Sequence, residues 1–158
     1  MHALLSVVLL LLMVPSASAQ REARAAGALF RGHDTGCWST SAVPCEGVGR
    51  AEIEVEAGRT PVDVRVVSVE VLPAGLTVWR QAGELHVMRR ADWVRTEPPH
   101  RPRPVIRFEA RARDTLLVFF SLIRAQEARV RVTLEVGGRR VVVEAEHRVT
   151  VESPDPDP

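Results

Sequence analysis

A short, arginine-rich segment with one tryptophan is the part of this sequence best suited to binding chemistry. Residues 89–104 read RRADWVRTEPPHRPRP and carry five Arg against one Asp and one Glu, a local excess of three positive charges. Four Pro residues favour a stiff, extended chain, which lets guanidinium groups hold carboxylates, sulfates or phosphates at little entropic cost. We therefore predict that Arg95, Arg101 and Arg103 contact an acidic partner, with Trp93 packed beside them, and retention on heparin or an acidic polysaccharide is the test. The alternative is an exposed connection between two sheets, with Trp93 folded back onto the core.

The two cysteines, Cys37 and Cys45, are the only ones in the chain. In an oxidising compartment they favour a disulfide that closes a short loop, worth about 2.5 kcal/mol by the chain-entropy model. A metal site that recruits His33 and Asp34 is the alternative, but zinc ligands usually show tighter paired spacing. A further possibility is a secreted inhibitor that presents this loop to a target enzyme.

Catalytic chemistry has little support in the sequence. The chain contains no nucleophile elbow, zinc-protease motif, P-loop, EF-hand loop or paired C-x2-C. A triad assembled in space from distant Ser, His and Asp residues remains open. The histidines beyond position 2 are scattered, without a second ligand at metal-binding spacing: His33, His86, His100 and His147. We expect no enzyme activity, no metal and no cofactor.

Three glutamates, Glu52, Glu54 and Glu56, line one face of a predicted strand. They could bind a cation, although a solvated outer face is the simpler interpretation. The whole chain has a net charge of only +1, which argues against a nucleic-acid-binding protein.

The amino-terminal residues predict export. Residues 4–14 read LLSVVLLLLMV, which is too short to span a bilayer but fits the apolar core of a secretory signal peptide. Pro15 breaks this segment, and Ala17-Ser18-Ala19 provides small residues for cleavage after Ala19. We therefore expect residues 1–19 to be removed, leaving a secreted or periplasmic chain without a transmembrane anchor.

Most of the remaining chain predicts strands. Residues 20–49 are expected to form a loop-rich segment that carries the disulfide, with a short helix over 21–28. From residue 50 onward apolar residues alternate with polar ones, which is typical of half-buried strands. The alternation changes phase at Val66-Val67, which predicts a bulge or a change of sheet. Short strands are expected around Leu76 and Val78 and around Leu85 and Val87, and Trp79 would by analogy lie in the core.

The carboxy-terminal part contains the clearest signals. Residues 115–125, TLLVFFSLIRA, are apolar on both faces and favour a strand buried on both sides over a helix capped by Asp114. Gly137-Gly138 predicts a two-residue hairpin in which Val136 lies opposite Arg139. That register places opposite charges across from each other and puts His147 on the apolar face.

These observations together predict an all-β chain. We expect an antiparallel β-sandwich of immunoglobulin-like type with seven or eight strands over residues 50–152, followed by a disordered tail, 153–158. The predicted function is a non-catalytic module that binds a protein or an anionic surface polymer, through residues 89–104 or an exposed strand edge. A small extracytoplasmic hydrolase or metal-dependent enzyme is the alternative.

Overall fold

The computed structural model describes residues 21–39, 47–83, 86–93, 105–122 and 127–151. The predicted all-β class and immunoglobulin-like sandwich are confirmed, with eleven strands in these residues rather than seven or eight. The strands are β1 (Glu22–Ala25), β2 (Ala28–His33), β3 (Thr35–Ser39), β4 (Gly47–Glu56), β5 (Val62–Pro73), β6 (Arg80–Gln81), β7 (His86–Arg89), β8 (Ile106–Phe108), β9 (Arg113–Leu122), β10 (Ala128–Val136) and β11 (Arg139–Val151). One short helix, α1 (Arg90–Trp93), follows β7.

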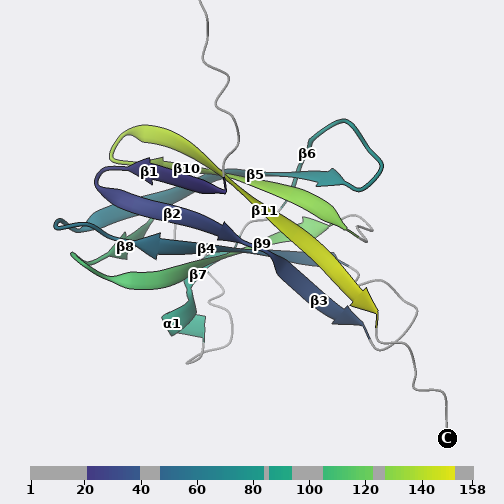
Figure 1. The fold of residues 1–158 in the computed structure, drawn as a ribbon, viewed down its shortest axis with the longest axis horizontal. Coiled ribbons are helices and arrows are strands. Elements are labelled where there is room, and N and C mark those ends of the chain that lie inside the picture. The colour runs from purple at the N-terminus through teal and green to yellow at the C-terminus, as the bar shows by residue number, and fades with distance from the viewer. Residues whose placement is uncertain (1–20, 40–46, 84–85, 94–104, 123–126, 152–158) are drawn as a thin grey trace, which may run out of the picture.

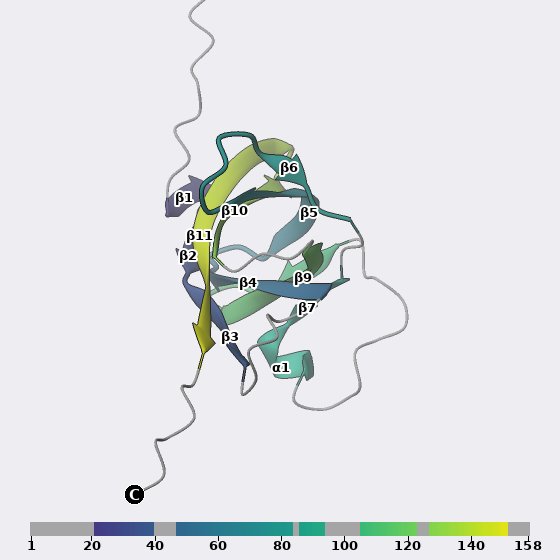
Figure 2. The same ribbon diagram turned by 90° about the vertical axis from the view of Figure 1, so that its right-hand side faces the viewer.

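The strands form two layers (Figures 1 and 2). A five-stranded sheet has the order β1-β2-β4-β9-β7, and a six-stranded sheet has the order β3-β11-β10-β5-β6, with β8 also paired to β5. Among the described pairs, only β3 and β11 are parallel. Only Asp34 separates β2 from β3, so the chain crosses from one sheet to the other without turning back. This crossing makes β3 run alongside β11 in the same direction.

A single apolar core fills the space between the sheets. Alternating side chains of both layers point inward, as the period-two pattern predicts. Its largest members are almost fully buried phenylalanines and branched aliphatic residues, among them Phe30, Phe108, Phe120, Ile53, Leu116 and Leu134.

The predicted hairpin at Gly137-Gly138 is confirmed. Val136 pairs with Arg139, and the register continues to Ala128 opposite His147. Both glycines have positive φ angles, 56° and 74°, which non-glycine residues rarely adopt. The ion pairs differ from the register in two respects: Glu144 holds both Arg129 and Arg131, and Glu135 pairs with Arg65 rather than with Arg140 opposite it.

The predicted phase change in β5 is a β-bulge. Thr133 of β10 lies opposite Ser68, whereas the next residue, Leu134, lies opposite Val66. Val67 is therefore the extra residue of the bulge, and the strand stays within one sheet. The bulge keeps valines on the core face on both sides of the phase change.

The predicted strand buried on both faces is β9. Leu116 and Val118 point into the core, and Leu117 between them is also fully buried, on the outer face of the five-stranded sheet. Met88 of β7 lies opposite Leu117, and α1 lies on the same outer side (Figure 2). Residues 123–125 of the predicted strand lie outside the described residues.

The expectation for residues 21–49 was wrong in its local structure. The predicted helix over 21–28 is instead β1 and the start of β2, and the segment expected to be loop-rich supplies β3 and the beginning of β4. Phe30 anchors β2 in the core with no exposed surface. Strand pairing with β4 overrides the weak helical preference of the Ala-rich stretch.

A second correction concerns residues 74–79, which we call the β5–β6 loop. Leu76 and Val78 lie outside any strand and are exposed, and Trp79 is half-buried in the loop rather than in the core. The chain turns at Ala74-Gly75, where Gly75 has a φ of 80°. The predicted signal peptide and the predicted tail lie outside the described residues. In the described part of the chain, no helix has the length and apolar character that crossing a membrane requires.

Candidate binding surfaces

Trp93 is the one described member of the predicted arginine-rich site. It lies in α1, and its ring packs at a tilt against Phe119 of β9, with ring centroids 6.4 Å apart. The guanidinium carbon of Arg50 lies 5.6 Å from the centroid of the Trp93 ring. The tryptophan is nevertheless 43% exposed. Trp93 therefore folds onto the outer face of the five-stranded sheet while keeping an open side.

The other predicted site residues cannot be placed with it. Arg95, Arg101 and Arg103 lie outside the described residues, so their contact with an acidic partner stays a prediction. Cys37 lies in β3, but Cys45 is outside the described residues. The disulfide and the inhibitor loop therefore also stay predictions.

The glutamate stripe on β4 is engaged by arginines. Glu54 accepts a hydrogen bond from Arg113 at 2.5 Å and faces His33 Nε2 at 3.0 Å. These contacts, that with Arg113 first, hold the pKa of Glu54 below its usual value. Glu52 pairs with Arg50 at 2.9 Å and with Arg90. These pairings fit the interpretation of the three glutamates as part of a solvated outer face rather than a cation-binding site.

No potential metal centre forms in the described residues. Nowhere in this part of the chain do three or more His, Cys, Asp or Glu side chains gather in a way that could hold an ion.

His147 is buried in the core, as its strand parity predicts. Its exposed fraction is only 2%. The Thr35 hydroxyl donates to the Arg50 carbonyl oxygen at 2.5 Å, so it accepts from His147 Nδ1 at 3.3 Å. Within the described residues, Nε2 of His147 has no hydrogen-bond partner. Burial, and secondarily the positive charge of Arg50, lower the pKa of this imidazole.

This buried imidazole predicts a loss of stability in mild acid. The unfolded chain takes up a proton on His147 near the ordinary pKa of 6.5, whereas the folded chain does so only at lower pH. Below 6.5 the unfolded state therefore binds more protons, and the free energy of unfolding falls until the folded pKa is passed. Urea unfolding at about pH 7 and about pH 5.5 measures the effect.

His147→Gln is expected to flatten this pH dependence, and His86→Gln, at an exposed site, is the matched control. Glu54 and Glu146 have pKa values lowered from 4.5, so their protonation changes the free energy of unfolding only at more acidic pH. An unchanged slope in His147→Gln would contradict the assignment.

The outer face of the six-stranded sheet carries a stacked cluster that we call the Trp79 platform: Trp79, Arg129, Arg131 and Glu144. The guanidinium carbon of Arg131 lies 4.0 Å from the centroid of the Trp79 ring, and that of Arg129 lies 5.6 Å away. Glu144, only 8% exposed, receives hydrogen bonds from Arg129 at 2.8 Å and Arg131 at 2.9 Å. Charge-assisted bonds and cation–π contact together fix the end of the β5–β6 loop on the sheet.

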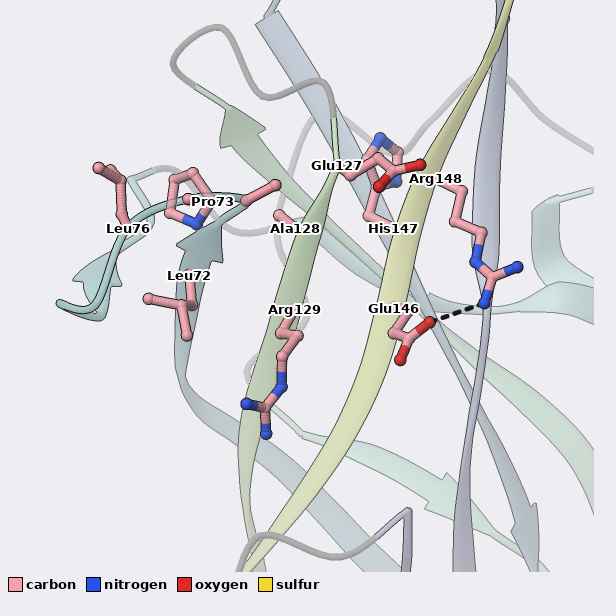
Figure 3. A pocket seen from close by; sticks show the side chains of 11 residues that line it. Leu72, Pro73, Leu76, Glu127, Ala128, Arg129, Glu146, His147 and Arg148 are labelled. Carbon is pink, nitrogen blue, oxygen red and sulfur yellow. Dashed lines mark hydrogen bonds and ion pairs between the residues drawn. The ribbon is translucent and has the colours of Figure 1, made fainter.

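A pocket of about 440 Å³ opens beside this platform. Figure 3 shows Leu72, Pro73 and Leu76 on one side and Glu146 and Arg148 on the other. The lining residues come from the end of β5, the β5–β6 loop and the neighbouring ends of β10 and β11: Leu72, Pro73, Ala74, Gly75, Leu76, Glu127, Ala128, Arg129, Glu146, His147 and Arg148.

The loop over this pocket exposes apolar side chains. Leu76 is 45% and Val78 is 68% exposed. The loop is nevertheless held at its base, because the Ala74 amide donates to the Glu127 carbonyl oxygen at 2.8 Å. Large apolar side chains on a fixed loop beside a pocket are typical of a protein-interaction site.

Sequence reasoning missed this surface. Leu76 and Val78 alternate with polar residues, which is also the pattern of a half-buried strand, and nothing local distinguishes the two cases. Gly75 just before them indicates a turn, but a turn can precede a new strand as well as a loop, so it does not separate the two cases.

Comparison with known proteins gives no family. No protein-family model matches this chain, and no curated protein matches its sequence. Solved structures with a similar arrangement of strands were found at low identity.

Three such structures illustrate the range. A FixG-related protein from Vibrio parahaemolyticus aligns with 79% of this chain and 98% of its own at 8% identity and a TM-score of 0.43. A second structure is a chain of the CsuC–CsuE chaperone–tip adhesion subunit pre-assembly complex from Csu pili of Acinetobacter baumannii. The alignment covers 77% of this chain and 52% of that chain, at 12% identity and a TM-score of 0.41. A family 123 glycoside hydrolase from Clostridium perfringens aligns with 75% of this chain at 8% identity and 0.43, and this chain spans only 22% of it. The likeness carries no conclusion about what this chain binds.

Proposed function

We propose that this chain is a non-catalytic binding module that takes up a peptide segment of a partner protein in the pocket beside the β5–β6 loop. The carrying observation is the exposure of Leu76 and Val78, 45% and 68%, on a tethered loop at the pocket. The predicted signal peptide supports a partner outside the cytoplasm.

The pocket's size and lining favour a single large apolar side chain as the anchor. Leu72, Pro73, Leu76 and Ala128 supply apolar walls, and about 440 Å³ is enough space for a leucine or an aromatic ring. Burying such a side chain contributes about 1.5–3 kcal/mol, which is the scale of an interface hot spot.

The charges at the rim favour a peptide over a polyanion. Two carboxylates, Glu127 and Glu146, balance two guanidinium groups, Arg129 and Arg148. Arg148 donates to Glu146 at 2.9 Å, and Arg129 is held by Glu144. A balanced rim gives polar contacts to a peptide backbone without attracting a strongly charged ligand.

A displayed library of random peptides, selected on the immobilised protein, tests the proposal. We expect selected peptides to share one large apolar residue and to bind at least about tenfold more weakly to the Leu76→Ser variant, because Leu76 lines the pocket and about 1.4 kcal/mol of apolar contact is lost. Fluorescence polarisation with a selected peptide measures the change.

Val105→Ser is the matched control, since Val105 is 46% exposed, like Leu76, but does not line the pocket. It is expected to bind like the wild type. The proposal is wrong if no apolar anchor is enriched, or if the loop variant and the control bind the selected peptides equally well.

A further inference from the structure

Four turns meet at the end of the sandwich opposite the β5–β6 loop (Figure 1). They connect β1 to β2, β4 to β5, β8 to β9 and β10 to β11. Their contacts are close: a Cβ atom built on Gly58 would lie 2.5 Å from the Gly27 carbonyl oxygen, and one on Gly137 would lie 2.9 Å from the Ala26 Cβ. The Arg111 amide donates to the Gly58 carbonyl oxygen at 2.7 Å. The four turns therefore form one continuous surface, which we call the turn end.

Exposed arginines gather on this surface. Arg59 and Arg111 lie in two of the turns, Arg139 and Arg140 begin β11 directly after a third, and all four are exposed. Within the described residues, none of these four has an ion pair.

Most of the acidic residues nearby are paired with other arginines. Glu56 pairs with Arg31 at 3.7 Å, and Glu135 pairs with Arg65 at 3.8 Å. Arg107 lies between two further acids, Asp63 at 3.5 Å and Glu109 at 3.3 Å, and its single charge balances one of them. The four arginines of the turn end outnumber the nearby acids that have no cation of their own, so this end keeps a positive excess in a chain whose net charge is only +1.

Arg111 occupies a backbone conformation that disfavours it. Its φ angle is 62°, in the left-handed region where glycine is the least strained residue. An arginine at such a position costs stability, and strained residues of this kind cluster at functional sites. This observation is independent of the charge count and points to the same turns.

The surroundings of the patch discriminate among anionic partners. The exposed large apolar residues of the described chain are Leu76, Val78, Trp93 and Val105, and none lies in these turns. The turn end therefore has no side chain to insert among lipids and no aromatic ring on which a nucleic-acid base could stack. Guanidinium forks alone suit the sulfate and carboxylate groups of an acidic polysaccharide.

We propose that the turn end binds an acidic polysaccharide through Arg59, Arg111, Arg139 and Arg140. The site differs from the residue 94–104 segment, and it lies at the opposite end from the proposed peptide pocket, so either can hold or fail without the other. The module then has two functional ends, with one facing an anionic polymer and the other a protein.

Heparin, a sulfated polysaccharide, is the probe. The Arg59→Ala/Arg139→Ala/Arg140→Ala variant is expected to elute from a heparin column at lower salt than the wild type and to bind heparin at least about tenfold more weakly. The matched control removes three exposed arginines elsewhere, outside the residue 89–104 segment: Arg21→Ala, Arg80→Ala and Arg148→Ala. It carries the same net charge and is expected to keep wild-type heparin affinity.

Arg111→Gly separates binding from folding. Glycine relieves the left-handed strain, so this variant is expected to melt at or above the wild-type temperature while binding heparin more weakly. Equal losses in the two triple variants, no heparin binding by the wild type, or tighter binding to anionic vesicles or duplex DNA than to heparin would each overturn the proposal.

Discussion

Replacing Gly32 with alanine is expected to remove roughly 3 to 5 kcal/mol from the free energy of unfolding. Gly32 lies in β2, where this strand crosses directly against β11. A Cβ atom added there would clash with the backbone oxygen of Glu144 and lie 2.9 Å from its carbonyl carbon. Neither atom can rotate away, because β11 is held in the six-stranded sheet by its pairing with β10. Chemical denaturation of the two proteins measures the loss.

Gly83→Ala is the matched control for this prediction. There the added Cβ would meet only the Ser121 hydroxyl oxygen, at 2.9 Å, and that side chain can change rotamer. We expect a change within about 1 kcal/mol. Similar losses in both variants would show that the close approach of β2 to β11 does not determine the outcome.

Phe30→Ala is expected to cost about 3–5 kcal/mol, a large share of the total stability of a domain this size. The Phe30 side chain has no exposed surface and packs in the central core, with Val55 directly opposite in β4. Its removal leaves a cavity that a two-layer sandwich cannot close without moving whole strands. Thermal and urea unfolding measure the cost.

The comparison variant is Phe119→Ala. Phe119 is half-buried on the outer face of β9 beneath Trp93, so truncation is expected to cost less than about 2 kcal/mol. If Phe30→Ala cost no more than Phe119→Ala, then β1 and β2 would not belong to the cooperative unit of the fold.

The parts of the fold that sequence reasoning predicted are those specified by two signals at once. In the β10–β11 hairpin, the Gly-Gly turn and the charge pattern select the same register, and the structure has that register. The Val66-Val67 phase change located the bulge because valines on both sides must reach one core. β9 could be assigned because a strand apolar on both faces needs cover on both faces.

The parts that were missed depend on contacts between distant segments. Phe30 and Gly32 lie among Ala, Gly and polar residues that have no clear period, and their roles come from β4 and β11. Trp79 resembles a core residue in sequence, but Arg131 and Arg129 hold it on the outer face. No local pattern encodes either arrangement.

The candidate sites likewise divide into one that local sequence could indicate and one that only distant segments form together. The segment around Trp93 was selected for its composition, and the described part of it packs onto the sheet. The turn end was not found, because its arginines are spread over residues 59–140 and come together only through the topology. A charge count along the sequence cannot detect such a patch.

The parallel pairing of β3 with β11 has a consequence for how the molecule assembles. Thr35 and His147, which face each other across this pair, are 112 positions apart in the sequence. A contact between such remote segments forms slowly, because the chain loses the entropy of closing a long loop before the contact contributes any stabilising free energy. During synthesis the third strand therefore waits for the last one to leave the ribosome. Until then both edges of β3 are unpaired rather than one, which exposes the nascent chain to association with its own copies.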